Sequence, residues 1–302
     1  MNEKHLIVIA GPTAVGKTAI AIRLAQHFNT EIISADARQF YKEMNIGTAK
    51  PTDEQLKLIP HHFINFLSVN DVYNVGQYEK DVLEKLNELF KTHDVVIMTG
   101  GAGLFIRAVT EGLDVLPSAD PEIRESLQEL FETQGIEALQ IKLEDVDPEY
   151  YKKVDIQNPV RLIRALEVFY ATGKPISTFH IRETPERPFK SIKICLELER
   201  ETLYNIINNR VDKMIDNGLL KEAENLFPLR HLNALQTVGY SELFDYLENT
   251  TDLKTAIEKI KQNTRNYAKR QMTWFRKDKE FVWINADDYE KIQSLVEAQL
   301  IN

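Results

Sequence analysis

Cysteine is almost absent from this sequence. Its 302 residues include one cysteine, Cys195, which excludes both an internal disulfide and a zinc site built from several cysteines. The alternating apolar segment 192–196 around it predicts a buried strand thiol with no functional role. Long hydrophobic runs are also missing: no apolar run approaches the roughly 18 residues of a membrane-spanning helix, and no signal-like leader precedes the first apolar segment. We therefore expect a cytoplasmic protein without a membrane partner.

An overall excess of positive charge is lacking too. The net charge is −9, with 37 basic against 46 acidic residues, which argues against a protein that coats nucleic acid indiscriminately. One stretch departs from this balance. Between Lys261 and Lys279 there are seven lysines and arginines but a single acid, Asp278, so this stretch carries +6 while the rest carries −15. The sequence thus predicts a basic face confined to one segment.

The first part of the chain has the pattern of alternating strands and helices. Apolar strand-like runs alternate with segments in which apolar residues recur at helical spacing, as in βαβ units. This pattern predicts an α/β fold with a P-loop-type parallel sheet core and flanking helices. The expected strands are 6–10, 31–34, 62–65 and 95–98, and the expected helices are 17–28 and 75–92.

A helical insertion interrupts this core. Linker-like residues at 116–121 and a proline-containing segment at 183–189 enclose charged, helical segments that are poor in strands. Strand character returns at 192–197, and 281–285 is a last short strand. We therefore predict a core formed by residues 1–114 and 189–302, a helical insertion at 115–188 that contacts the substrate, and a basic C-terminal helix that packs back on the core.

A phosphate-binding motif follows the first strand. Gly11-Pro12-Thr13-Ala14-Val15-Gly16-Lys17-Thr18 matches G-x-x-x-x-G-K-[ST], and it lies between a strand and an amphipathic helix, the context in which this motif functions. Loop N–H groups and the positive end of the helix dipole favour a phosphate, Lys17 adds a positive charge, and the Thr18 hydroxyl can ligate Mg²⁺. All eight residues are candidate diphosphate ligands, with Mg²⁺ as the cofactor.

The acid expected of an ATP-hydrolysing site is missing. Strand 95–98 runs into Thr99-Gly100-Gly101, and the acid beside this strand, Asp94, lies at its opposite end. Asp36 instead follows the carboxyl end of a strand, where α/β sheets bind ligands, so we expect it to face the P-loop. There it could act as a general base, or alternatively as a helix cap or an outer partner of Mg²⁺.

Two further regions could contact a nucleic acid. Arg38 and Gln39, next to Asp36, offer charge and paired donor and acceptor groups for a phosphate or a base edge. Near the C-terminus, cations are interleaved with aromatic residues, which suits base stacking and backbone contact, although an amphipathic helix with a solvated basic face is the simpler alternative. The residues in question are Arg265, Tyr267, Lys269, Arg270, Trp274 and Arg276.

Taken together, these residues resemble the tRNA dimethylallyltransferase family, also called tRNA isopentenyltransferases. The similarity covers nearly the whole chain and keeps the order of the family's motifs. It runs through the P-loop, Asp36 to Gln39 with Tyr41, Ile46-Gly47-Thr48-Ala49-Lys50-Pro51, Pro60-His61-His62, residues 99–104, Asp120-Pro121 with Arg124, Arg161-x-x-Arg164-Ala165-Leu166-Glu167-Val168, Val238-Gly239-Tyr240, and Thr264-Arg265-x-Tyr267-Ala268-Lys269-Arg270-Gln271.

The resemblance implies a specific reaction. Dimethylallyl diphosphate would bind the P-loop with Mg²⁺, and the exocyclic N6 of the adenosine next to the anticodon, position 37, would attack its C1 carbon and release pyrophosphate. Asp36 would be the base, Lys17 and Thr18 would serve the diphosphate, and Thr13 would lie on the substrate side. The positions implied to contact tRNA are Asp36, Ala37, Arg38, Gln39, Ala102, Arg124, Val160, Arg161, Leu162, Ile163 and Arg164.

Three positions depart from the family pattern, because Ala37, Ala102 and Phe105 stand where serine, threonine and tyrosine are usual. Each departure removes a hydroxyl that could bind the target nucleotide. The alternatives that stay open are a P-loop small-molecule kinase, an adenylate isopentenyltransferase of the cytokinin-forming type, and a nucleotide-gated RNA-binding module without catalysis. No feature of the sequence calls for a partner subunit, so we expect a monomer.

Overall fold

The computed structural model describes residues 3–114, 116–117, 120–179 and 185–301. The chain separates into two compact units, which are described one at a time. The first unit is formed by residues 1–111 and 186–302, and the second by residues 112–185. Among the described residues, no helix combines the length and the apolar character needed to cross a bilayer.

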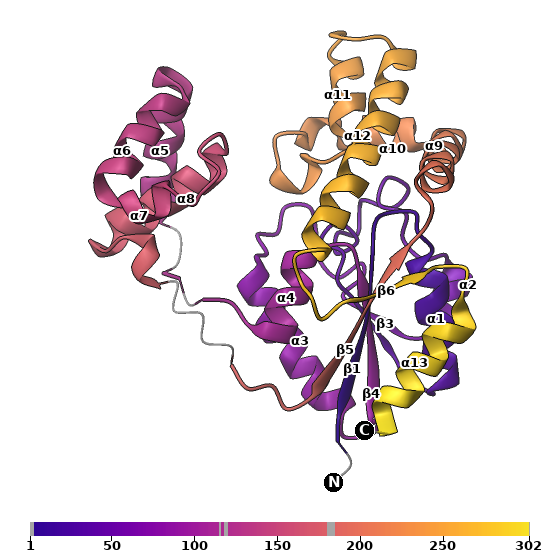
Figure 1. Cartoon of the computed structure of the whole chain (residues 1–302). Helices are drawn as coiled ribbons and strands as arrows, with labels where there is room; N and C mark the ends of the chain where they lie inside the picture. The colour runs from indigo at the N-terminus through magenta and orange to yellow at the C-terminus, as the bar shows by residue number, and fades with distance from the viewer. Residues whose placement is uncertain (1–2, 115, 118–119, 180–184, 302) are drawn as a thin grey trace. The chain divides into compact units, whose positions relative to one another are not determined.

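A parallel six-stranded sheet forms the centre of the first unit (Figure 1). The strand order is β3-β2-β4-β1-β5-β6, and each adjacent pair is parallel. Ala10 at the end of β1 lies level with Gly100 of β4 and Cys195 of β5, so the carboxyl ends of the central strands share one edge. The predicted α/β fold is therefore confirmed. The strands are β1 (His5–Ala10), β2 (Ile32–Ser34), β3 (His61–His62), β4 (Val95–Gly100), β5 (Lys190–Glu197) and β6 (Val282–Asn285).

Helices cover both faces of the sheet. Along β1, Leu6 and Val8 belong to the hydrophobic cluster that includes α3 (Val75–Leu89) and α4 (Gly103–Glu111). Ile7 and Ile9 belong to the opposite cluster, with α1 (Lys17–His27) and α13 (Tyr289–Ile301). Because successive strand residues point to opposite faces, a strand covered on both sides must be apolar throughout, as β1 is. Each such buried side chain stabilises the fold by about 1.5–3 kcal/mol.

The expected strand at 62–65 was wrong in its extent. Strand β3 comprises His61 and His62 alone, and it pairs with β2. Phe63 and Asn65 have φ values of 61° and 56°, in the left-handed region that ends an extended strand. The other five strands were predicted correctly, and their predicted ends lie within two residues of the observed ends.

Four helices lie beyond the carboxyl edge of the sheet in the first unit (Figure 1). The longest, α12, carries the basic segment, begins with the Asp252 side chain accepting a bond from the Thr255 N–H, and packs against α9, α11 and α4. These helices are α9 (Arg200–Asp216), α10 (Leu219–Leu226), α11 (Ser241–Leu247) and α12 (Leu253–Phe275), with short 3-10 turns at Phe227–Leu229 and Asn233–Leu235. The short helix α2 (Asp53–Leu58) precedes β3.

The second unit is a small helical bundle with its own apolar core. Leu139, Leu143, Leu162 and Leu166 are fully buried at its centre. Its elements are α5 (Pro121–Gln134), α6 (Ile136–Val146), α7 (Pro148–Tyr151), α8 (Pro159–Thr172) and the 3-10 turn Ile176–Phe179. Three of these helices, α5, α7 and α8, start with a proline that follows an Asp or Asn cap, a typical helix start.

Candidate functional site

The P-loop connects β1 to α1 and requires glycine at two points. Gly11 has φ 143°, and a Cβ there would lie 2.8 Å from the Leu196 carbonyl oxygen of β5. Gly16 has φ 99° and forms the cap of α1. Residues other than glycine rarely adopt these backbone angles, which explains why the motif has glycine at these two positions. The loop therefore places its N–H groups at the start of α1, where anions bind.

The Lys17 ammonium lies within this loop. Its Nζ donates to the carbonyl oxygens of Gly11 and Pro12, at 3.0 and 2.7 Å. Burial lowers the pKa of Lys17 to about 8, although the nearby Asp36 carboxylate acts in the opposite direction. A phosphate bound here would favour the charged form of Lys17, because an opposite charge at close range stabilises the ammonium.

Two chain segments meet tightly where β2 and β4 end. The Ala35 N–H donates to the Thr99 carbonyl at 2.7 Å, and the Ala102 N–H donates to the Ala35 carbonyl at 3.2 Å. A Cβ on Gly100 would lie 2.1 Å from that Ala35 oxygen, so the approach needs glycine. These contacts fix the position of Asp36, whose Oδ1 accepts a bond from the Arg38 N–H at 3.1 Å.

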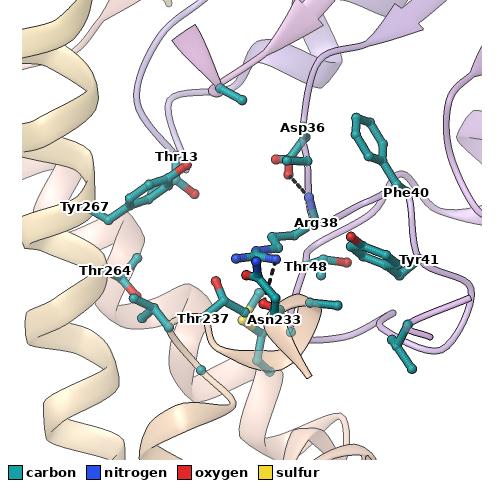
Figure 2. A pocket seen from close by; sticks show the side chains of 18 of the residues that line it. Thr13, Asp36, Arg38, Phe40, Tyr41, Thr48, Asn233, Thr237, Thr264 and Tyr267 are labelled. Atoms are coloured by element: carbon teal, nitrogen blue, oxygen red, sulfur yellow. Dashed lines mark hydrogen bonds between the residues drawn. The ribbon is translucent and has the colours of Figure 1, made fainter. Parts of the chain in front are cut away.

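A cavity of about 630 Å³, called here the main cavity, joins the P-loop to Asp36 (Figure 2). Thr13 and Ala14 line it from the P-loop, Asp36 from the end of β2, and Tyr267 from α12. Apolar side chains form much of the remaining wall. They include Phe40, Val69, Phe105, Ile207, Val211, Met214, Leu219 and Ile260. The cavity thus offers an anion-binding loop, a carboxylate and an apolar surface to one ligand.

Arg210 is a site residue that sequence reasoning missed. It lies on α9, lines the main cavity, and its Nη1 donates to the Thr13 hydroxyl at 3.2 Å. Burial lowers the pKa of Arg210, and Asp36 acts in the opposite direction. An arginine inside a helix, far along the chain from any motif, gives no sequence signal of this role. It adds a second cation beside the P-loop.

Gln271 is the second residue that was missed as part of the site. It is 6% exposed, its Oε1 accepts the Thr13 N–H at 2.8 Å, and its Nε2 donates to the Gly101 carbonyl at 3.0 Å. A Cβ on Gly101 would lie 2.1 Å from that Nε2. Helix α12 is therefore bonded directly to the P-loop and to the glycine-rich turn after β4. The sequence feature that could have indicated this role is an amide side chain among the lysines and arginines of the basic segment.

We expect the Gln271→Met variant to weaken both the fold and the use of the diphosphate substrate. Methionine matches the length of glutamine but leaves the Thr13 N–H and the Gly101 carbonyl without partners, at a cost of about 1–3 kcal/mol each. Denaturant unfolding and the KM for the diphosphate substrate measure the two effects. Gln271→Glu keeps the acceptor for Thr13 but places a buried negative charge beside the P-loop and the Gly101 carbonyl, so it should not restore the KM. Wild-type values in the methionine variant would contradict this role.

The residues after Asp36 divide between two tasks. Asp36, Ala37 and Arg38 line the main cavity, and the Arg38 guanidinium donates to the carbonyls of Asn233 and Gln236 at 3.1 and 3.5 Å (Figure 2). The amide of Gln39 points elsewhere: it donates to the carbonyls of Thr48 and Ala49 at 3.2 and 3.3 Å. Its amide therefore holds the turn at 48–49.

The Glu222 carboxylate orders the turn at 45–47, which precedes the turn at 48–49. Glu222 of α10 accepts the N–H groups of Asn45, Ile46 and Gly47 at 2.9–3.0 Å, and the hydroxyl of Tyr240 at 2.6 Å. A Cβ on Gly47 would lie 2.5 Å from the Tyr240 ring. The motifs at 46–51 and 238–240 are thus explained by their contact with each other.

The basic residues of α12, and Arg276 directly after it, are arranged in two ways. Lys269, Arg270 and Arg276 are exposed, whereas Arg265 is half-buried and donates to the side chain of Asn208 on α9. Tyr267 lines the main cavity, as Thr13 does, and burial together with the Asp36 carboxylate raises its pKa to about 12 (Figure 2). The exposed cations are available to a polyanion, while Arg265 serves the packing of two helices.

In the second unit, two arginines flank a buried acid. Glu167 is 1% exposed, and Arg164 Nη1 and Arg124 Nε lie 3.2 and 3.6 Å from its oxygens. Arg164 Nη2 also donates to the Pro117 carbonyl at 2.6 Å. Of the three arginines considered for RNA contact in this unit, Arg161 and part of Arg124 are therefore exposed, while Arg164 is held by Glu167.

The structure corrects the predicted side-chain contacts of Leu162 and Ile163. Both lie in the core of the bundle, 0% and 4% exposed, and cannot reach an RNA. The reason is helical geometry, since the apolar residues at 162, 163 and 166 share the inner face of α8. Val160 and Arg161 occupy the outer face and are exposed.

The three positions that lack hydroxyl groups line one wall. Ala37, Ala102 and Phe105 all line the main cavity. The Phe105 ring packs against Tyr78 and Phe40, with ring centroids 5.0 and 5.7 Å apart. The cavity is therefore less polar at these positions than the family pattern implies.

The residues beside the P-loop suit Mg²⁺. This ion prefers oxygen ligands and usually binds proteins through one or two side chains together with substrate phosphates and water. Thr18 is in the first turn of α1 and carries a hydroxyl, and Asp36 lies near enough to Lys17 to affect the pKa of that lysine. An acidic cluster elsewhere, Glu111 with Asp278 and Glu280, is instead occupied by the Lys193 ammonium at 2.6–3.0 Å.

Known proteins with a similar sequence and fold share one kind of activity. A sequence model of the family described as IPP transferase matches residues 39–278. The tRNA dimethylallyltransferase of Christiangramia forsetii is 56% identical over 289 residues, 96% of each chain. The tRNA dimethylallyltransferase 1 of Bacteroides fragilis is 47% identical over 300 residues, 99% of this chain and 100% of the relative.

Solved structures agree with the sequence relatives. The full-length tRNA isopentenylpyrophosphate transferase of Bacillus halodurans is 34% identical, with a TM-score of 0.74, and the match covers 99% of this chain and 97% of that one. A eukaryotic dimethylallyltransferase acting on tRNA is 28% identical, with a TM-score of 0.79, over 94% of this chain and 74% of that one. The similarity therefore extends over both units of the chain.

Proposed function

Because this chain belongs to the IPP transferase family, we propose that it is a tRNA dimethylallyltransferase. It transfers the dimethylallyl group of dimethylallyl diphosphate to the exocyclic N6 of the adenosine at position 37, next to the anticodon of tRNA, and releases pyrophosphate. The observation that carries this proposal is the main cavity, in which the P-loop, Asp36 and an apolar wall face one space.

The chemistry of this transfer fits the groups that line the cavity. The bond between C1 and the diphosphate oxygen breaks as the new bond between C1 and N6 forms, so negative charge accumulates on the leaving group. Loop N–H groups, Lys17 and Arg210 stabilise this charge more in the transition state than in the ground state. Asp36 accepts the proton that N6 loses. Thr18 would hold Mg²⁺, which would supply further charge neutralisation for the leaving group.

The tRNA would be held by residues of both units. We propose contacts from Asp36, Ala37, Arg38 and Ala102, from Lys269 and Arg270 of α12 and Arg276 directly after it, and from Arg124, Val160, Arg161 and Arg164 of the helical unit. Exposed cations suit the phosphate backbone, and Tyr267 suits the face of a base. We also propose that the protein acts on tRNA as a monomer in the cytoplasm.

The alternatives predict different products. A P-loop kinase would consume ATP, and an adenylate isopentenyltransferase would modify free nucleotides and bind no tRNA. The deciding experiment is mass analysis of tRNA nucleosides after incubation of the enzyme with dimethylallyl diphosphate, Mg²⁺ and unmodified tRNA. We expect N6-dimethylallyladenosine in amounts equal to the pyrophosphate released. ADP formation from ATP, or modified free nucleotide with unchanged tRNA, would overturn the proposal.

The KM for dimethylallyl diphosphate is expected to rise with pH above about 8. Burial places the pKa of Lys17 at about 8, so the ammonium is charged below this pH and the affinity there is independent of Lys17 titration. Above it, the enzyme must take up a proton to bind the anion, and the KM should increase by about tenfold per pH unit. Initial rates between about pH 7 and pH 10 measure the effect.

The Lys17→Met variant provides the control for this pH dependence. Without a titrating group at this position, its KM should be high at every pH and should lose the break near pH 8. The same break in wild type and variant would assign it to another group.

A further inference from the structure

A second cavity, of about 430 Å³, lies between the start of α4 and the end of α12. Gly103 and Arg107 of α4 line it, as do Trp274 at the end of α12 and Lys277 and Lys279 in the turn that follows. The proposed mechanism uses none of these five residues. We call this space the second cavity.

Two chain segments, residues 102–103 and helix α12, line the main cavity and then the second cavity. Ala102 lines the main cavity and the next residue, Gly103, lines the second. On α12, Tyr267 lines the main cavity and Trp274 lines the second, seven residues later or roughly 10 Å along the helix axis. The Gln271 bond to the Gly101 carbonyl lies between them. A strand of RNA with one residue in the main cavity can therefore reach the second.

An aromatic surface forms one wall of the second cavity. Trp274 is 37% exposed although it is among the largest apolar side chains of the protein. Its indole rests on Gly103, where a Cβ would lie 2.1 Å from the ring atoms Cδ1 and Nε1. Glycine at 103 thus lets the indole lie against α4 at the cavity wall. A partly exposed indole at the wall of a cavity is a suitable surface for stacking a base.

A buried lysine controls the charge of this cavity. Two acids, Glu111 and Asp278, also line it and would repel a phosphate. Lys193, whose side chain is 3% exposed, lies 2.6 Å from Glu111, 3.0 Å from Asp278 and 2.7 Å from Glu280. The ammonium offsets part of this acidic cluster, and Arg107 Nε also lies 3.4 Å from Glu111. Arg107, Lys277 and Lys279 outnumber the two acids of the lining, which is therefore positive by one charge.

We propose that the second cavity binds a nucleotide next to the target adenosine, with its base on Trp274 and its phosphate facing Arg107, Lys277 and Lys279. This inference rests on the proposed function, because a base that leaves a stacked loop to reach Asp36 exposes the face of its neighbour. Trp274 restores a stacking partner for that neighbour. Lys193 acts through Glu111 and Asp278 and is a positioning residue.

Removing a single base tests this assignment. Wild type and Trp274→Ala are compared on anticodon stem–loop RNAs that are intact, or abasic at the 5′ or the 3′ neighbour of the target. On intact RNA we expect the alanine variant to lose about tenfold in kcat/KM, within the range of one base–aromatic stack. On the RNA that lacks the stacked base, the two enzymes should be equal. An equal loss on all three RNAs would overturn the proposal.

One further variant separates stacking from folding. Trp274→Phe keeps an aromatic face and should restore most of the activity that is lost in the alanine variant. If Trp274 had a purely structural role, the phenylalanine variant would show a partial loss of activity on every RNA. The KM for dimethylallyl diphosphate should stay at its wild-type value in both Trp274 variants. Modification of intact RNA by the wild-type enzyme tests the proposed function itself. If the proposed function is wrong, the wild-type enzyme does not modify this RNA; if only the proposal for the second cavity is wrong, it does.

The interactions with phosphate are tested by salt. The double variant Lys277→Gln with Lys279→Gln should lower the slope of log affinity against log salt concentration by roughly one for each lysine–phosphate pair that is removed. Lys193→Met should weaken RNA binding at low salt, because Glu111 and Asp278 then face the phosphate without neutralisation. Lys57→Gln, an exposed cation on α2 outside both cavities, is the matched control. An unchanged slope in the double variant would exclude phosphate binding here.

Discussion

Replacing Asp36 by asparagine is expected to slow the chemical step by about 10²-fold or more. Asparagine keeps the shape of the side chain and the Oδ1 that accepts the Arg38 N–H at 3.1 Å, so the turn after β2 should persist. It cannot take the proton from N6. Affinity for tRNA and for dimethylallyl diphosphate should stay near wild type, because the P-loop and the arginines are unchanged. The measurement is the single-turnover rate with enzyme in excess over tRNA.

A matched variant controls for the loss of charge alone. Asp288→Asn also keeps an Oδ1 that caps a backbone N–H, that of Lys291 at 3.1 Å, but it lies at the start of α13. Its rate should equal that of wild type. A wild-type rate in Asp36→Asn would remove Asp36 from the role of general base, and the proton would then have to leave through solvent or the diphosphate.

The Lys17→Met variant should lose about 10²-fold in kcat/KM for dimethylallyl diphosphate, the scale of losing one charged donor to a developing anion. The ammonium lies among the carbonyls of the P-loop, 2.7–3.0 Å from two of them, where a diphosphate rather than an RNA is expected to bind. Affinity for tRNA, measured by gel shift, should therefore be unchanged. Lys91→Met, an exposed lysine after α3, serves as the control.

The two variants together distinguish the two halves of the site. Asp36→Asn should lower the rate at saturating diphosphate, whereas much of the loss in Lys17→Met should appear in the KM. Loss of tRNA affinity in Lys17→Met would contradict the separation of the diphosphate and RNA surfaces.

The sequence was most informative where the structure depends on local patterns. The P-loop, the position of Asp36 and the parallel sheet follow from glycine spacing and from apolar runs within a few residues. Arg210 and Gln271 could not be predicted in the same way, because they reach Thr13 from helices 197 and 258 positions away. Periodicity predicts a helix but does not say against which loop its side chains pack.

The same limit explains the errors of detail. Leu162 and Ile163 were assigned to an RNA surface because they belong to a motif, although the apolar face of their own helix places them in the core. Strand 62–65 was too long because left-handed backbone angles at Phe63 and Asn65 are not visible in the residue types alone. Asparagine tolerates such angles, but phenylalanine rarely adopts them.

The order of strands in the sheet also bears on how this protein is synthesised. Strand β5 pairs with β1 along its whole length, yet it leaves the ribosome only after the helical unit has been made. Until then β1 lacks one neighbour, while the helical unit already holds all of its own core. Domains fold as units during translation, so the helical unit can fold first. The phosphate-binding loop gains its contact with Gln271 still later, once α12 has been made.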